Sequence, residues 1–273
     1  MSPDRPLLVA TDLDGTVVRG DGTISARTVA ALRAVEDAGA CVVFVTGRPP
    51  RWMREVAEQT GHTGLAICAN GALVYDLHRE EVVERFELAP AVALDVVRRL
   101  RAALPGIAFA AESVPTGGPA SFGREPDYRL RYDIGEHRVG TVEELLDAPL
   151  AKLLVRHEQH DVDDLLAAAR EVLGDLVEVT HSTPHGPALL EVSAPGVSKA
   201  TTLARLCAER SVDAERVIAF GDMPNDLPML AWAGTSYAVA NAHPDVLAAV
   251  DRRTASNDDD GVARVLEQLF PPA

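Results

Sequence analysis

Short, continuously apolar runs separated by helical sequence constrain the fold of this chain more than any other feature. Continuous apolar runs of this length are typical of strands that are buried on both faces of a parallel sheet. Residues 7–11 form the clearest run, and further strand-like segments follow at residues 41–47, 65–71, 216–222 and 235–241. The helix-like sequence after most of them supplies the crossover connections that parallel strands need. The pattern predicts an α/β fold with a doubly wound parallel sheet, and residues 71–87 add a small hairpin.

The sequence between residues 86 and 192 has a different character. Two amphipathic helical segments and three strand-like segments follow one another there in an order unlike that of the flanks. We therefore expect an inserted α/β domain at residues 86–192 within a core made of residues 1–85 and 193–273. The loop at 113–127 is rich in glycine and proline, which favours exposed surface.

Charge and composition limit the partners of the chain. The formal net charge is −15, whereas a nucleic-acid backbone requires clustered Lys and Arg. No stretch reaches the roughly 18 uncharged apolar residues that a membrane span needs, and acidic residues near the N-terminus argue against a signal peptide. We expect a cytoplasmic protein without nucleic-acid, membrane or obligate protein partners.

The three cysteines and the two lysines are informative because they are so few. Cys41, Cys68 and Cys207 lie in apolar surroundings and are too scattered for a disulfide framework or a zinc cluster, so we expect buried thiols. Lys199 follows a helix-capping serine, where a positive charge opposes the helix dipole by a few tenths of a kcal/mol. An anion held nearby would explain this lysine. We expect Lys152 to be solvated or to extend its ammonium to the surface.

The first predicted strand ends in a pair of carboxylates, in the segment Asp12-Leu13-Asp14-Gly15-Thr16. Ligands of doubly wound sheets bind beyond the carboxyl ends of the strands. Residues two apart on an extended segment point the same way, which would bring Asp12 and Asp14 towards a common site. A divalent cation or a shared proton would relieve their repulsion. The alternative is an Asp-rich turn that caps the next element.

Further polar residues follow two other strands. Thr46-Gly47-Arg48 offers the hydroxyl, the close backbone approach and the cation that phosphate binding requires, or else a helix cap with an exposed arginine. The segment 221–226 brings Asp222 and Asp226 to the same edge of the sheet. Four acidic side chains there need compensating positive charge, and Mg²⁺ suits oxygen ligands. A polar turn with Asp and Asn at helix caps is the alternative.

Taken in order, these segments resemble the four motifs of the haloacid dehalogenase superfamily, in particular its Cof-type branch with an α/β (type IIB) cap. Further matches lie at residues 69–72, 239–244 and 256–262. The insert lies between the second and third motifs, where that branch carries its cap. The resemblance thus implies a catalytic core with an inserted, substrate-selecting cap domain.

The resemblance also implies roles for individual residues. Asp12 corresponds to the nucleophile that is transiently phosphorylated, and Asp14 to the general acid and base. Mg²⁺ would be held by the Asp12 side chain, the Asp14 backbone carbonyl and Asp222. Asp226 would orient Lys199 or a metal-bound water. The predicted phosphate-binding and supporting groups are the Leu13 and Gly47 amides, Thr46, Arg48, Lys199, Asn225 and Asn70.

The predicted function is a Mg²⁺-dependent phosphatase that hydrolyses a small phosphorylated metabolite, such as a sugar phosphate, a nucleotide or a cofactor phosphate, through an aspartyl phosphate on Asp12. An acid at position 14 is absent from the family's dehalogenases and is replaced by Thr in its transport ATPases. A sugar phosphomutase of the same fold and a non-catalytic metal-dependent binding module are the alternatives.

Some polar residues of the insert have no evident partner in the sequence. We expect the four insert histidines to be solvated capping residues rather than metal ligands. Three arginines of the insert could contact a distal anionic group of a substrate or could be exposed. The histidines are His157, His160, His181 and His185, and the arginines are Arg124, Arg129 and Arg131.

Residues 257–260, outside the insert, are expected to form a solvated turn.

Overall fold

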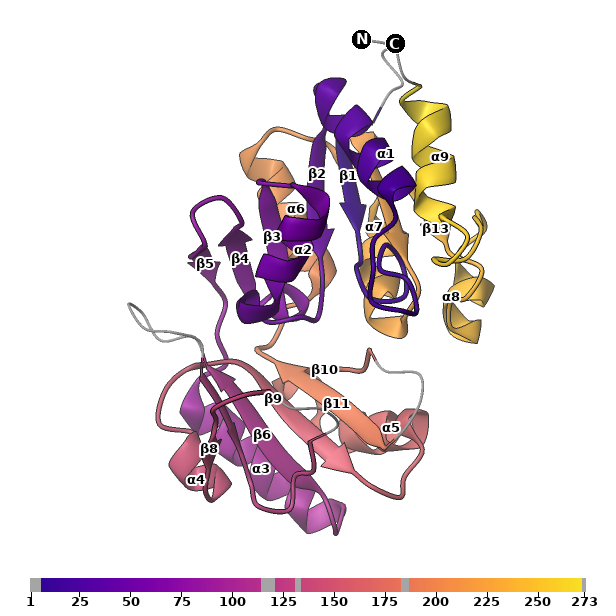
Figure 1. Ribbon diagram of the computed structural model, residues 1–273. Coiled ribbons are helices and arrows are strands. Elements are labelled where there is room, and N and C mark those ends of the chain that lie inside the picture. Colours follow the sequence, from indigo (N-terminus) through magenta and orange to yellow (C-terminus); the bar gives the residue numbers. More distant parts are fainter. Residues whose placement is uncertain (1–5, 114–120, 131–133, 183–186, 272–273) are drawn as a thin grey trace. The chain divides into compact units, whose positions relative to one another are not determined.

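A computed structural model describes residues 6–113, 121–130, 134–182 and 187–271 (Figure 1). The chain divides into two compact units. The first comprises Met1–Glu84 and Ser198–Ala273, and the second comprises Arg85–Val197, slightly more than the predicted insert. Each unit is described by itself below.

Within its described residues, the first unit holds a seven-stranded sheet in the order β13-β12-β1-β2-β3-β4-β5. The strands β13, β12, β1, β2 and β3 are parallel to one another, and β4 returns antiparallel to β3. The bounds are β1 Leu8–Thr11, β2 Cys41–Val45, β3 Leu65–Cys68, β4 Leu73–Asp76, β5 Glu81–Arg85, β12 Val217–Gly221 and β13 Thr235–Ala238. The predicted α/β fold with a parallel sheet is confirmed.

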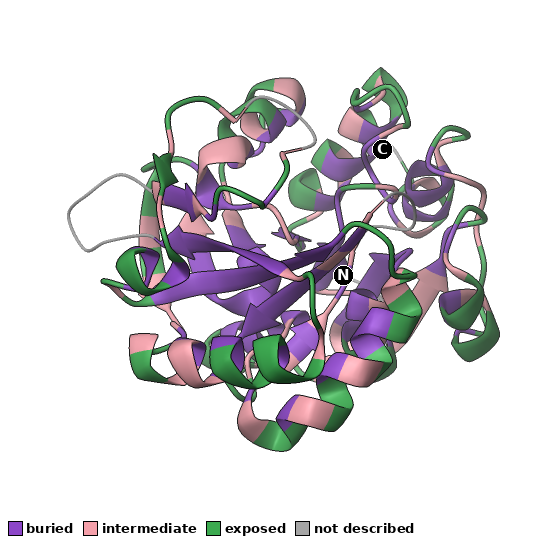
Figure 2. Cartoon of the chain, turned by 90° about the horizontal axis from the view of Figure 1, so that it is seen from below, coloured by how far each residue is buried: buried purple, intermediate pink, exposed green. Residues whose placement is uncertain are grey.

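Helices cover both faces of this sheet, as expected for strands that are apolar throughout (Figure 1). Helix α1 packs beside α9 on one face, and α6 packs beside α7 on the other. The helices of this unit are α1 Ala26–Asp37, α2 Met53–Thr60, α6 Lys199–Glu209, α7 Leu227–Trp232, α8 Pro244–Ala249 and α9 Gly261–Leu269, with short 3-10 turns η1 Pro50–Trp52, η2 Ala69–Gly71, η4 Ala214–Arg216 and η5 Pro224–Asp226. Figure 2 shows the inner faces of the helices and the central strands buried and the outer helix faces exposed.

Three of the predicted strands extend two or three residues too far towards their carboxyl ends. Strand β2 stops at Val45, β3 at Cys68 and β13 at Ala238. After β3 the backbone turns sharply, because Ala69 and Asn70 adopt positive φ angles of 50° and 57°. The residues that were assigned to strand ends therefore form loops at one edge of the sheet.

The second unit contains, in its described residues, a six-stranded sheet in the order β10-β11-β9-β6-β7-β8. Its central strands are antiparallel. One face packs on α3 and α5 through apolar residues such as Val96, Leu153 and Leu165. The elements are α3 Pro90–Ala103, β6 Ala108–Ser113, β7 Ser121–Arg124, β8 Arg138–Val139, α4 Val142–Leu145, β9 Leu150–His157, α5 Val162–Leu173, η3 Gly174–Leu176, β10 Glu178–Thr180 and β11 Ala188–Ser193.

Buried polar residues in the second unit correct two expectations. Lys152 is 6% exposed and pairs with the carboxylate of Glu191 on the neighbouring strand, so it is not solvated. His157 is buried and caps a turn, because its Nδ1 accepts hydrogen bonds from the amides of Gln159 and His160. His181 is also buried, with Nε2 3.0 Å from Asp163. The charge of Lys152 is thus neutralised by a partner 39 residues away in sequence.

The other polar residues considered in the insert differ in their exposure to solvent. His160 and Arg129 are exposed. Arg124 is partly buried and donates to His137 and to the carbonyls of Glu125, Pro126 and Tyr128. His185, Arg131 and part of the loop at 113–127 lie outside the described residues.

The cysteines differ from one another in exposure. Cys68 and Cys207 are buried as predicted, but Cys41 is exposed at the start of β2. The expectation of three buried thiols is therefore wrong for Cys41. No helix among the described residues is both long enough and apolar enough to cross a membrane.

Candidate active site

The loop after β1 gives its two carboxylates different degrees of burial. Asp12 continues the strand, because its amide donates to the carbonyl of Phe220 at 3.0 Å, and it is 5% exposed. The chain then turns around Leu13, whose carbonyl accepts from the amides of residues 16, 17 and 18. Asp14 is consequently exposed. The segment is therefore a turn rather than an extended strand. Burial raises the pKa of Asp12 most, and the negative charge of Asp14 adds to that rise, so the two carboxylates still act on each other.

Lys199 is the buried cation of the site. It is the first residue of α6, after the N-cap Ser198, and it is 2% exposed. Its Nζ donates to Oδ1 of Asp12 and to Oδ1 of Asp226, at 2.6 Å each. Burial alone would lower the pKa of Lys199, but these two carboxylates raise it above its ordinary value. Lys199 is therefore a fixed positive charge.

A glycine allows α6 to start so close to the loop after β3. Gly71 has a φ of 106°, and a Cβ atom there would lie 2.3 Å from the carbonyl oxygen of Ser198. Thr202 of the same helix donates its hydroxyl to the Gly71 carbonyl at 2.7 Å. Only a residue without a side chain fits this contact. The position of Lys199 thus depends on Gly71.

Asp222 and Asp226 complete the acidic cluster at the end of β12. Oδ2 of Asp226 accepts from the amides of Asp222 and Met223, at 3.1 Å each, which fixes the loop. Oδ1 of Asp222 accepts from the hydroxyl of Thr16 at 2.9 Å. The loops after β1 and β12 are thereby joined by side chains that are 206 residues apart in sequence.

The cluster carries more negative than positive charge. One oxygen each of Asp12, Asp222 and Asp226 lies within 4.8 Å of the others, and all three residues are buried. Burial raises the pKa of Asp12 well above its ordinary value and that of Asp222 to about 7. Lys199 balances only one of the three carboxylates. The donor set fits a divalent, oxygen-seeking cation such as Mg²⁺.

Asp14 and Arg48 form a separate pair beside this cluster. The Arg48 guanidinium donates from Nε to Oδ2 of Asp14 at 2.8 Å and from Nη2 to Oδ1 at 2.5 Å. The Arg48 amide donates to the hydroxyl oxygen of Thr46 at 3.0 Å. Arg48 is thus paired in a bidentate geometry of the kind that also recognises phosphate.

Two buried asparagines meet next to the loop after β2. Nδ2 of Asn225 donates to Oδ1 of Asn70 at 3.0 Å, and the Asn70 amide donates to the Thr46 carbonyl at 3.0 Å. Among the described residues, Nδ2 of Asn70 and Oδ1 of Asn225 have no hydrogen-bond partner although both are buried. Unsatisfied buried polar atoms are rare in folded proteins and often mark a ligand site.

The structure brings most of the predicted residues to one edge of the sheet. Asp12, Lys199, Asp222 and Asp226 touch one another, while Leu13, Thr46, Gly47 and Arg48 follow the adjacent strand ends. Three contacts went unrecognised in the sequence, those made by Thr16, Asn241 and Asn257. The signal for Asn241 was its place in the loop beyond the carboxyl end of a strand, three residues after β13. The turn at 257–260 is anchored rather than simply solvated, since Asn257 is buried and Asp260 pairs with Arg19 at 2.7 Å.

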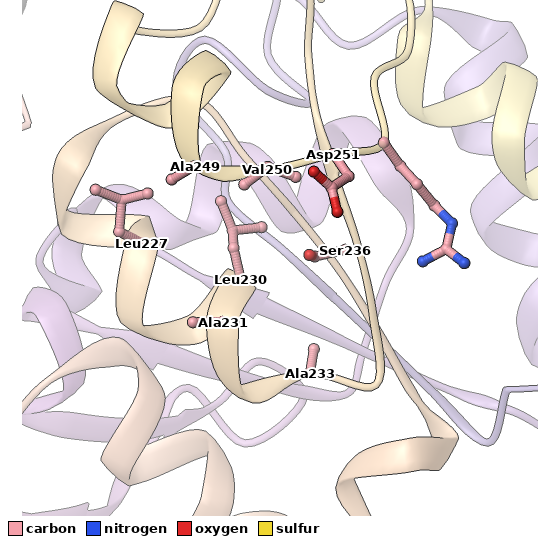
Figure 3. Close-up of a pocket in the computed structure, with 9 residues that line it drawn as sticks. Leu227, Leu230, Ala231, Ala233, Ser236, Ala249, Val250 and Asp251 are labelled. Carbon is pink, nitrogen blue, oxygen red and sulfur yellow. The ribbon is translucent and has the colours of Figure 1, made fainter.

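A cavity of about 420 Å³ lies elsewhere in the first unit, between α7, β13 and the segment after α8 (Figure 3). Figure 3 shows apolar side chains such as Leu227, Leu230 and Val250 around it, with Asp251 and Ser236 at its wall. None of the predicted site residues lines it. We do not assign it to the chemistry of the acidic cluster.

Comparisons with known proteins agree with this geometry. The model of the haloacid dehalogenase-like hydrolase family matches residues 9–266, and the chain belongs to that family. The chain is 30% identical to the Bacillus subtilis 5-amino-6-(5-phospho-D-ribitylamino)uracil phosphatase YitU, over 97% of this chain and 98% of that protein. It is 25% identical to the Escherichia coli pyridoxal phosphate phosphatase YbhA, over 95% and 97% of the two chains.

A solved structure shares the fold. It is the HAD subclass IIB sugar phosphatase BT4131, with a TM-score of 0.79 at 21% identity, covering 96% of this chain and 98% of that one. The predictions of the superfamily and of a phosphatase-type hydrolase are confirmed by the family match and by the phosphatase names of the relatives.

Proposed function

We propose that the protein is a cytoplasmic, Mg²⁺-dependent phosphatase that hydrolyses a small phosphomonoester through an aspartyl phosphate on Asp12. The observation that carries the proposal is the buried contact between the Asp12 carboxylate and Lys199, next to Asp222 and Asp226. A desolvated carboxylate beside a fixed cation is suited to attack phosphorus, because the cation offsets the repulsion between the carboxylate and the anionic phosphoryl oxygens.

The chemistry divides into two displacements. An Asp12 oxygen forms a bond to phosphorus while the bond from phosphorus to the ester oxygen breaks, and Asp14 gives that oxygen a proton. Water then attacks the phosphorus of the aspartyl phosphate and passes a proton to Asp14. The bond between the Asp12 oxygen and phosphorus breaks, which releases inorganic phosphate and restores Asp12.

The surrounding residues would hold the phosphoryl group during both steps. Lys199 would pair with its oxygens, and the unpartnered Asn70 Nδ2 would donate to one of them. Mg²⁺, when bound by Asp12, Asp222 and the Asp14 carbonyl, would neutralise charge on the phosphoryl oxygens.

Arg48 would link substrate binding to the release of Asp14. A phosphate ester carries oxygen acceptors that suit the planar guanidinium as well as a carboxylate does. An arriving phosphate would therefore replace Asp14 on Arg48, and Asp14 would become available to the leaving oxygen.

The identity of the leaving group is set outside the acidic cluster. Relatives of this chain are named for a ribitylaminouracil phosphate and for pyridoxal phosphate, and the structural relative is named a sugar phosphatase. We propose that substrates of this chain belong to the same broad class of small phosphorylated metabolites. The second unit, Arg85–Val197, would act as the cap that selects among them.

The direct experiment measures release of phosphate from 4-nitrophenyl phosphate and from a panel of metabolite phosphates with Mg²⁺. Wild-type protein should turn over, and Asp12→Asn should lose activity by at least about a thousandfold because the nucleophile is removed. Asp37→Asn, at the exposed end of α1, is the matched control and should keep wild-type activity.

Retention of activity by folded Asp12→Asn would refute the proposed nucleophile. The product also separates phosphatase from phosphomutase. Inorganic phosphate as the sole phosphorylated product supports hydrolysis, whereas an isomeric sugar phosphate would replace the proposal with a mutase.

A further inference from the structure

Two asparagines outside the acidic cluster hold the turn that carries Asp14. Asn241 lies three residues after β13, and Asn257 lies in the loop before α9. Nδ2 of Asn241 donates to the carbonyl of Gly15 at 2.8 Å. Nδ2 of Asn257 donates to the carbonyl of Val18 at 2.9 Å. Asn241 therefore holds the turn at Gly15, next to Asp14, and Asn257 holds it at Val18, where the turn ends.

The asparagines are also joined to each other. Oδ1 of Asn241 accepts from the backbone amide of Asn257 at 3.0 Å, so Asn241 uses its donor and its acceptor at once. Asn257 is buried, with 9% exposure. Leaving the Val18 carbonyl without this donor would leave a partly desolvated acceptor unpaired. The pair is thus one connected network rather than two separate contacts.

The same segment contacts the backbone of Asp222. The His243 amide donates to the carbonyl of Asp222 at 2.7 Å. Thr16, inside the Asp14 turn, donates its hydroxyl to Oδ1 of Asp222. The segment around Asn241 is therefore fixed to both carboxylate-bearing loops.

Additional contacts extend this anchoring along the turn. The Gly20 amide donates to Oδ1 of Asp258 at 2.9 Å, and Arg19 donates to Oδ1 of Asp260 at 2.7 Å. Within the turn, a backbone bridge connects Asp14 with Val18, the residue that Asn257 holds. A shift of Val18 is consequently transmitted to Asp14.

We propose that Asn241 and Asn257 are positioning residues that set the place of Asp14 relative to Asp12 and Asp222. This inference rests on the proposed phosphatase function. Among the described residues, the hydrogen bonds of these two side chains go to Gly15, Val18 and Asn257 rather than to Asp12, Asp222 or Asp226. Their effect passes through the Gly15 and Val18 carbonyls, and Asp14 is the group of that turn that transfers protons in the proposed reaction.

The test is a double-mutant cycle between Asn241 and Asp14, read as steady-state kcat with 4-nitrophenyl phosphate and Mg²⁺. Asn241→Ala in the presence of Asp14 should lower kcat by about 10-fold to 100-fold, because a misplacement of about 1 Å has effects of that size. In the Asp14→Asn background, the same substitution should lower the residual kcat by less than about twofold. Asn257→Ala should follow the same pattern.

A control and an adverse outcome complete the design. Asp259→Ala alters the same loop, where the Asp259 carboxylate accepts a hydrogen bond from the Ser256 hydroxyl, and should keep wild-type kcat. A purely structural role for Asn241 would lower kcat by the same factor in both backgrounds, and that result would overturn the inference. Unchanged kcat in Asn241→Ala would overturn it as well. Failure of the proposed function is distinguished because wild-type protein would then show no turnover that depends on Asp12.

Discussion

At the scale of single residues, Lys199 shows how one buried cation organises several carboxylates. The ammonium is shared between Asp12 and Asp226, and Asp226 in turn holds the amides of Asp222 and Met223. A lone buried carboxylate would be unstable in its charged form, but a hydrogen-bonded pair with a lysine is tolerated. Lys199 therefore connects Asp12 with the carboxylate that holds the loop after β12.

The excess negative charge predicts that Mg²⁺ stabilises the folded protein. A ligand that binds only the folded state raises the free energy of unfolding by about 2.7 kcal/mol at 100 times its dissociation constant. We expect Mg²⁺ to raise the thermal midpoint of wild-type protein, and Asp222→Asn to reduce that rise because it removes one of the clustered carboxylates. Differential scanning calorimetry with and without Mg²⁺ measures both.

The matched control for this measurement is Asp251→Asn, an exposed carboxylate at the wall of the separate cavity, which should respond to Mg²⁺ as wild type does. An equal Mg²⁺ response in Asp222→Asn and wild type would contradict the assignment of Asp222 as a ligand.

At the scale of elements, the geometry of the candidate site depends on the residue at which each strand ends. The apolar runs at 7–11 and 41–47 were sufficient to predict buried strands, because burial on both faces leaves no other composition. Their ends were not predictable from hydrophobicity alone. After β3 the chain turns at Asn70, which has a positive φ angle. After β1 it turns around the Leu13 carbonyl, and Asp14 lies in that turn.

The pairing of polar side chains was even less visible in the sequence. Lys152 and Glu191 are 39 residues apart, and Asn257 and Val18 are 239 apart. Strand order and register decide which polar groups meet. A local sequence pattern specifies neither the order nor the register. The candidate site could be predicted as a set of residues, but its hydrogen-bond network required the folded structure.

The contact between the loop after β3 and α6 predicts a specific sensitivity at Gly71. Gly71→Ala should destabilise the fold by about 3 kcal/mol or more, because the new methyl group meets the Ser198 carbonyl and the backbone has a positive φ. Gly39→Ala is the control, since its φ is also positive, at 80°, but nothing lies within 4 Å of the added atom. It should cost only about 1 kcal/mol. Urea denaturation measures both values, and equal losses would show that crowding at Ser198 is unimportant.

At the scale of the whole molecule, the first unit is built from two separate segments of the sequence, and the second unit from one continuous segment. The second unit, Arg85–Val197, has its own apolar core between its sheet and its helices. Its size is that of an ordinary independent domain. The first unit is completed only when Ser198–Ala273 joins Met1–Glu84.

This division predicts that residues 85–197 fold when they are produced alone. We expect a cooperative urea transition and a circular dichroism spectrum with both helix and strand. Leu153→Asp in the same fragment, which places a charge in the core, should abolish the transition. A fragment that lacks a cooperative transition would show that the second unit depends on the first.

The residues of the candidate site precede and follow the second unit in the sequence, and this order has a consequence for biosynthesis. On the ribosome, Asp12 emerges before the second unit, whereas Lys199, Asp222 and Asp226 emerge after it, about two hundred residues later than Asp12. The second unit leaves the exit tunnel in between and has time to fold first, since translation proceeds at about 5–20 residues per second. A nascent chain that ends before Ser198 therefore carries the proposed nucleophile without its lysine, and our proposal predicts that such a chain does not hydrolyse phosphate esters.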